Sequence, residues 1–149
     1  MFSRMNSQGI RVMLIDDSKV IRHCAQSFLT PAGCEVFVSE DGFDALAKIA
    51  DYRPDFIFLD AIMPRLNGFK TCSLIKSNDQ YKHIPVVMLS AKDSIFDRVR
   101  GRLAGADGYM TKPFSSEGLR QAIDAHPRQA HRNVAPLMEL NFAPTANAG

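Results

Sequence analysis

Acidic, hydroxyl and basic side chains stand directly after apolar runs at four places in this sequence. The four groups are Asp16-Asp17 after residues 11–15, Asp60 after residues 56–59, Ser90 after residues 85–89 and Lys112 after residues 107–111. Each has an ordinary explanation by itself, because Asp and Ser also cap helices and begin turns, and lysine is common on surfaces. Their shared position at the ends of apolar runs is what suggests chemistry.

If the runs are parallel strands of one sheet, their carboxyl ends form the edge at which ligands bind. Asp16, Asp17 and Asp60 then share a pocket, and two like charges about 4 Å apart repel by roughly 4 kcal/mol at an effective dielectric near 20. Such a cluster favours a cation with oxygen ligands, which suits Mg²⁺. With Lys112 and Ser90 beside it, the pocket has the parts that phosphoryl transfer requires. Asp60 would be the nucleophile, forming an aspartyl phosphate.

The elements that position these residues follow from apolar periodicity. Short apolar runs predict strands at 11–15, 34–38, 56–59, 85–89 and 107–111. Helical spacing predicts helices that begin near Ser18, Gly42, Gly68, Ser94 and Ser116, and the fourth places Ile95, Val99 and Leu103 on one face. Strands that alternate with helices over crossovers of about 20 residues predict a doubly wound parallel sheet, ordered 2-1-3-4-5, covered by helices on both faces.

Composition indicates a single domain of ordinary size. The 149 residues are 46% hydrophobic with a formal charge of +2, which implies no large basic surface for nucleic acid. The three cysteines have no CxxC spacing, and neither a signal peptide nor a bilayer-spanning run is evident, so we expect a cytoplasmic protein without membrane insertion. Residues 1–9 are expected to be a flexible leader and 127–149 a flexible tail, too short for a DNA-binding output domain.

Four motifs resemble the receiver domain of two-component response regulators, which has a flavodoxin-like, CheY-type fold. The resemblance covers residues 10–126. The motifs are Asp16-Asp17-Ser18, Asp60-x-x-Met63-Pro64-x-x-x-Gly68, Ser90-Ala91 and Tyr109-x-x-Lys112-Pro113-Phe114.

This resemblance implies roles for individual residues. Asp17 and Asp60 would coordinate Mg²⁺, or Mn²⁺ as an alternative, with Asp16 acting mostly through water and Ile62 through its backbone carbonyl. The remaining implied roles are a switch pair of Ser90 and Tyr109, phosphate contacts from Ala91 and Lys112, and a cis peptide bond between Lys112 and Pro113.

The resemblance also implies a function: transfer of a phosphoryl group to Asp60 from a chemotaxis-type histidine kinase or phosphotransfer domain. Ser90 would then contact the phosphate, Tyr109 would move inward, and the surface of residues 94–126 would change. Candidate partner contacts are Phe96, Arg98, Arg102 and Tyr109, although the arginines are equally well explained as a solvated basic face. Ile62 cannot orient a water molecule, so we expect slow self-dephosphorylation. The resemblance also implies a phosphoryl acceptor and not a conventional enzyme.

A narrower resemblance is carried by DDSKVIR, GFDALAKIAD, MPRLNGFKTCSLIK and KPFS. These segments are similar to single-domain response regulators that control type IV pilus twitching motility. The implied output partner is a protein of the pilus or motility machinery.

Three other functions fit parts of the sequence. A small-molecule aspartyl phosphatase or phosphotransferase would use the acids and the lysine, but dehalogenase-type phosphatases have a second acid where Ile62 stands. A nucleotide-binding protein would have a glycine-rich loop after the first strand, where Asp16-Asp17-Ser18 stands instead. A receiver-fold adaptor that signals without phosphate has no distinguishing sequence feature.

Overall fold

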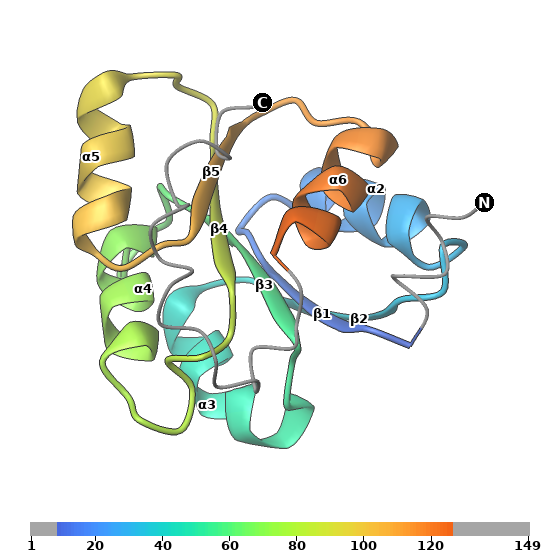
Figure 1. The fold of residues 1–149 in the computed structure, drawn as a ribbon, viewed down its shortest axis with the longest axis horizontal. Coiled ribbons are helices and arrows are strands. Elements are labelled where there is room, and N and C mark those ends of the chain that lie inside the picture. Colours follow the sequence, from blue (N-terminus) through green and yellow to red (C-terminus); the bar gives the residue numbers. More distant parts are fainter. Residues whose placement is uncertain (1–8, 127–149) are drawn as a thin grey trace.

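A computed structural model describes residues 9–126 and gives a five-stranded sheet with helices on both faces (Figure 1). In chain order the elements are β1 (Arg11–Ile15), α2 (Lys19–Leu29), β2 (Glu35–Ser39), α3 (Gly42–Tyr52), β3 (Phe56–Asp60), α4 (Gly68–Lys76), β4 (Val86–Ser90), α5 (Ile95–Leu103), β5 (Gly108–Thr111) and α6 (Ser116–Ala125). The expected leader, apart from Gly9, and the expected tail lie outside the described residues.

The strands are all parallel and lie in the order β2-β1-β3-β4-β5, which confirms the predicted doubly wound fold. The observed strands differ from the predicted ranges by at most one residue at either end, so that Asp60 and Ser90 are the last residues of their strands. Within residues 9–126, the helices are all too short or too polar to cross a bilayer.

Two hydrophobic cores lie on opposite faces of the sheet, because successive strand residues point to opposite sides. Met13, Ile57 and Met88 face one core, beneath α3, α4 and α5. Leu14, Phe58 and Val87 face the other, beneath α2 and α6. This double burial explains why the central strands are continuous apolar runs and not alternating ones.

Polar residues begin the helices at the predicted places. Ser18, Asp41, Asn67, Ser94 and Ser115 are N-caps, and each accepts a hydrogen bond from a backbone N–H in the first turn of its helix. Such caps satisfy donors that would otherwise lack partners. The caps therefore determine where each loop at the carboxyl edge of the sheet ends.

Helix α5 has the predicted periodicity, but its apolar face points away from the sheet. Ile95, Val99 and Leu103 are 74%, 50% and 81% exposed. Gly101 is the buried residue, and a Cβ there would lie 3.6 Å from side-chain atoms of Met88 and Tyr109. The helix therefore packs against the sheet through the face that carries Gly101.

Candidate functional site

Strand register brings the predicted acidic residues together at one edge of the sheet. Ile15 of β1 pairs with Leu59 of β3, so Asp16 and Asp60 follow at the same level. Carboxylate oxygens of Asp16, Asp17 and Asp60 all lie within 4.8 Å of one another. Asp16 and Asp60 are buried, whereas Asp17 is exposed.

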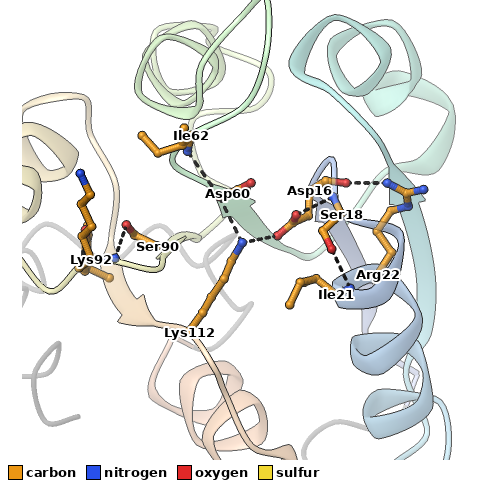
Figure 2. A network of polar contacts seen from close by, with 10 residues as sticks. Asp16, Ser18, Ile21, Arg22, Asp60, Ile62, Ser90, Lys92 and Lys112 are labelled. Carbon is orange, nitrogen blue, oxygen red and sulfur yellow. Dashed lines mark hydrogen bonds and ion pairs between the residues drawn. The ribbon is translucent and has the colours of Figure 1, made fainter.

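Lys112 bridges the two buried carboxylates (Figure 2). Its Nζ lies 2.8 Å from Asp16 Oδ2 and 3.3 Å from Asp60 Oδ1. Burial lowers the pKa of the ammonium, but the hydrogen bonds and negative charges of Asp16 and Asp60 together outweigh this effect and raise it above its ordinary value. Lys112 therefore supplies a permanent positive charge to the pocket at neutral pH.

Asp60 has a strongly perturbed pKa. Burial and the neighbouring charge of Asp16 raise the pKa from 3.8 to about 7, against the opposing effects of Lys112 and the Ile62 N–H. A carboxyl group with this pKa gains a proton easily, and a nearby cation would favour its charged form. Strongly shifted pKa values are typical of functional carboxyl groups, so the raised pKa supports a functional role for Asp60.

Backbone and side-chain contacts hold the two buried carboxylates in place. Asp16 Oδ1 accepts a hydrogen bond from Ser18 N at 2.9 Å, and the Asp16 carbonyl accepts one from Arg22 Nη1 at 2.7 Å. Asp60 Oδ1 accepts a hydrogen bond from Ile62 N at 3.3 Å (Figure 2). Sequence reasoning missed Arg22, although its spacing of four residues from the Ser18 cap places it one turn away on the same side of α2.

Gly68 is required by the close approach of backbone to backbone. A Cβ at this position would lie 2.1 Å from the Asp60 carbonyl oxygen, a distance that no side chain can adopt. Gly68 N also donates to the Ala61 carbonyl at 2.9 Å. The glycine thus allows α4 to begin directly beside the end of β3.

Ser90 and Tyr109 lie on neighbouring strands and both contact Lys92. Ser90 is buried, and its Oγ accepts a hydrogen bond from Lys92 N at 3.1 Å. Tyr109 is also buried, and its hydroxyl donates to the Lys92 carbonyl at 2.9 Å. Ala91, between the two contacts, is exposed.

The remaining predicted residues lie around this centre. The Lys112–Pro113 peptide bond is cis. Phe96 is 72% exposed on α5, and Arg102 is exposed on the same helix. Arg98 is not a freely solvated side chain, because it pairs with Asp93 and its guanidinium lies 4.9 Å from the centre of the Tyr109 ring.

The donor set fits a divalent cation. Three carboxylates and one lysine leave an excess of negative charge, and all of the acidic ligands are oxygens, which Mg²⁺, Ca²⁺ and Mn²⁺ prefer. The exposure of Asp17 leaves one side of the cluster open to water, which suits an ion that retains part of its hydration shell.

Comparisons with known proteins agree with this geometry. Residues 12–124 match the response regulator receiver domain family. The chain is 57% identical over 120 residues to Protein PilG of Pseudomonas aeruginosa, which covers 80% of this chain and 89% of PilG. Chemotaxis protein CheY4 of Vibrio cholerae has a TM-score of 0.76 at 35% identity, covering 79% of this chain and 98% of CheY4. The Mn(2+)-bound form of response regulator Rcp1 has a TM-score of 0.66 at 26% identity, covering 78% of this chain and 90% of that one.

Proposed function

The chain belongs to the response regulator receiver family, and on that basis we propose that Asp60 accepts a phosphoryl group from a phosphohistidine. The observation that carries the proposal is the bridge from Lys112 to Asp16 and Asp60 inside a cluster of three carboxylates. A structural ion pair would need only one acid for one lysine. The excess negative charge is instead suited to a site that binds a cation and then an anion.

Receiver domains bind a divalent metal at such an acidic pocket, and we propose Mg²⁺ here, with Mn²⁺ as an alternative. The carboxylates of Asp16, Asp17 and Asp60 and the backbone carbonyl of Ile62 would hold it. When bound, the metal neutralises charge on the oxygens of the transferring phosphoryl group. The Mn(2+)-bound form of the related Rcp1 supports this assignment.

The transfer step follows from the positions of Asp60 and Lys112. A carboxylate oxygen of Asp60 would attack phosphorus in line with the P–N bond of the phosphohistidine, whose electron pair would remain on the imidazole as the P–O bond forms. Because Lys112 stays protonated, its ammonium would attract the phosphoryl oxygens throughout. The donor would be a chemotaxis-type histidine kinase or a phosphotransfer domain.

Phosphorylation would change the contacts of Ser90 and Tyr109. The Ser90 hydroxyl, whose oxygen accepts from Lys92 N, would donate its proton to a phosphate oxygen, with the backbone at Ala91 as a further phosphate contact. The Tyr109 hydroxyl donates to the Lys92 carbonyl, so movement of the backbone at Lys92 would change how often the Tyr109 ring occupies each of its positions. This coupling would transmit phosphorylation from β4 to β5 and α5.

The partner surface that we propose lies on α5 and β5. Of the expected contacts, Phe96, Arg98 and Arg102 reach this surface beside the exposed apolar stripe of Ile95, Val99 and Leu103. Tyr109 is buried beneath the Arg98 guanidinium, so it would join the surface only if its ring moved. Exposed apolar side chains gathered on one helix are typical of interaction sites. The similarity to PilG supports an output protein of the pilus or motility machinery as the partner, and hence control of type IV pilus twitching motility.

We further propose a receiver domain at residues 10–126 and a cytoplasmic location, the latter because histidine kinases present their phosphohistidine in the cytoplasm. Protein contact, without DNA binding, would be its means of signalling. Self-dephosphorylation would be slow, since Ile62 is apolar and 60% exposed beside Asp60 and offers no hydrogen bond to an attacking water.

Intact-protein mass spectrometry after incubation with acetyl phosphate and Mg²⁺ tests the acceptor. We expect one added phosphoryl group on the wild type, none on Asp60→Asn, and one on the control Asp51→Asn, which changes an exposed carboxylate on α3. An adduct on Asp60→Asn would refute the assignment. A wild type that remains unmodified, even with a phosphorylated chemotaxis-type kinase as donor, would favour the adaptor that works without phosphate.

A further inference from the structure

The loop that follows the proposed acceptor is fastened at its base and at its tip. At the base, Gly68 N donates to the Ala61 carbonyl at 2.9 Å, which closes residues 61–68 into a compact loop. Ile62 lies within this loop, and its side chain is 60% exposed. The Ile62 backbone is held by its own N–H, which donates to Asp60 Oδ1 at 3.3 Å, and by its buried neighbours Ala61 and Met63. The fastening at the tip adds to these contacts on the far side of the loop.

Arg65, at the tip, has an unusual backbone conformation. Its φ is 65°, and Leu66 N donates to the Pro64 carbonyl at 2.8 Å across it, which forms a γ-turn with a positive central φ. Residues with a Cβ disfavour this region, and such conformations persist only where neighbouring contacts enforce them. Glycine would adopt it readily, so the presence of arginine points to a role for the side chain.

The Arg65 side chain reaches the first turn of α3. Its Nη2 forms an ion pair with Asp41 Oδ2, and its guanidinium lies 5.5 Å from the centre of the Phe43 ring. Asp41 is also the N-cap of α3, where its Oδ1 accepts a hydrogen bond from Asp44 N at 2.8 Å. The loop tip is therefore attached to a residue that the helix itself holds in place.

Packing beside this ion pair is tight. A Cβ on Gly42 would lie 2.2 Å from the Thr71 hydroxyl oxygen and 3.0 Å from a methyl carbon of Leu66. The start of α3 thus lies directly against the loop and the first turns of α4, as the proximity of the two helices in Figure 1 indicates. The ion pair connects two surfaces that have little freedom to separate.

We propose that Arg65 is a positioning residue for the metal site, acting through Asp41 and Phe43 to hold the loop that carries the Ile62 carbonyl. This inference rests on the proposed function, because it assigns Arg65 a part in the same pocket. Removing the arginine would let the loop tip relax and would misplace the carbonyl ligand without touching any carboxylate of the cluster. Loss of a group that contacts a metal ligand directly typically weakens metal binding by about 10- to 100-fold. Arg65 acts through the loop, so we expect an effect at the lower end of this range.

The test is the Mg²⁺ dissociation constant of the full unphosphorylated chain, measured by isothermal titration calorimetry together with the melting temperature. We expect Arg65→Gly to weaken binding by about tenfold while melting no lower than the wild type, since glycine accepts a positive φ. The matched control is Arg53→Gly. Arg53 also has a positive φ, 48°, but it lies at the opposite end of α3 and should leave the constant unchanged.

Two further comparisons separate positioning from simple charge. Loss of a nearby cation would by itself tighten Mg²⁺ binding, so tighter or unchanged binding in Arg65→Gly would overturn the proposal. Asp41→Asn keeps an effective N-cap but removes the ion pair. Asp41→Asn should weaken Mg²⁺ binding when made alone and have little further effect when added to Arg65→Gly. Additive effects of the two substitutions would contradict a shared role.

The same titration distinguishes failure of this inference from failure of the proposed function. A wild type that binds neither Mg²⁺ nor Mn²⁺ would overturn the metal site itself, and with it the role of Arg65. A wild type that binds Mg²⁺ alongside an Arg65→Gly variant of equal affinity would overturn only the positioning role.

Discussion

Replacing Asp60 by asparagine should stabilise the protein, and the gain should depend on pH. The side chain is buried beside Asp16, and its pKa is raised from 3.8 to about 7 by burial and by that neighbouring charge. The charged form is therefore disfavoured in the folded protein relative to the unfolded chain. Asparagine has nearly the same shape and never becomes charged, so Asp60→Asn removes this cost.

The sign and size follow from proton linkage. Between pH 4 and pH 7 the folded state binds more protons at Asp60 than the unfolded state, so the unfolding free energy of the wild type falls as the pH rises. A pKa raised from 3.8 to about 7 corresponds to about 4 kcal/mol in total. The unfolding free energy of the wild type should fall by about 2–3 kcal/mol between pH 5 and pH 8 for this reason, and that of Asp60→Asn should not.

Urea unfolding followed by circular dichroism, in EDTA at pH 5 and at pH 8, measures this difference. The stabilisation by Asp60→Asn should be larger at pH 8 by about 2–3 kcal/mol. An equal effect at both pH values would refute the electrostatic account of the pocket. As a control, excess Mg²⁺ at pH 8 should stabilise the wild type more than Asp60→Asn, because binding to the folded state requires the carboxylates.

Three other substitutions test separate parts of the site. Gly68→Ala would place a Cβ 2.1 Å from the Asp60 carbonyl oxygen, so we expect a loss of about 1–3 kcal/mol in unfolding free energy, and an unchanged melting temperature would contradict the close approach. Lys112→Met would leave buried Asp16 without its counter-charge and should cost about 3–5 kcal/mol in urea unfolding in EDTA at pH 8, where a loss below about 1 kcal/mol would show that the bridge is weak. Ile62→Asn should shorten the lifetime of the phosphorylated protein, followed by mass spectrometry in Mg²⁺ after acetyl phosphate has been removed, and an unchanged lifetime would exclude water orientation at this position.

Local patterns were sufficient to predict the architecture. Runs such as Phe56–Leu59 indicate strands covered on both faces, and their alternation with capped helices permits few topologies other than a doubly wound sheet. Because parallel strands end at one edge, the positions of Asp16, Asp60 and Lys112 after their strands were enough to predict a shared pocket.

The orientation of α5 could not be predicted in this way. Ile95, Val99 and Leu103 have the spacing of a core-facing stripe, yet the helix packs through Gly101. The Arg100 guanidinium lies 4.0 Å from the centre of the Phe69 ring, so a charged residue with a long apolar stem covers part of the core. Periodicity identifies the apolar face of a helix but does not decide whether that face is buried.

The sequence by itself determined which side chains would stand at the carboxyl edge of the sheet, because strand ends and helix caps are local properties. Only the tertiary structure decided how those side chains affect one another. The raised pKa of Asp60 depends on its burial and its distance from Asp16, and the conformation of Arg65 depends on Asp41 and Phe43, which lie more than 20 positions away in the sequence. Electrostatic and steric effects act through space, and the spacing of residues along a chain specifies neither their separation nor the dielectric between them.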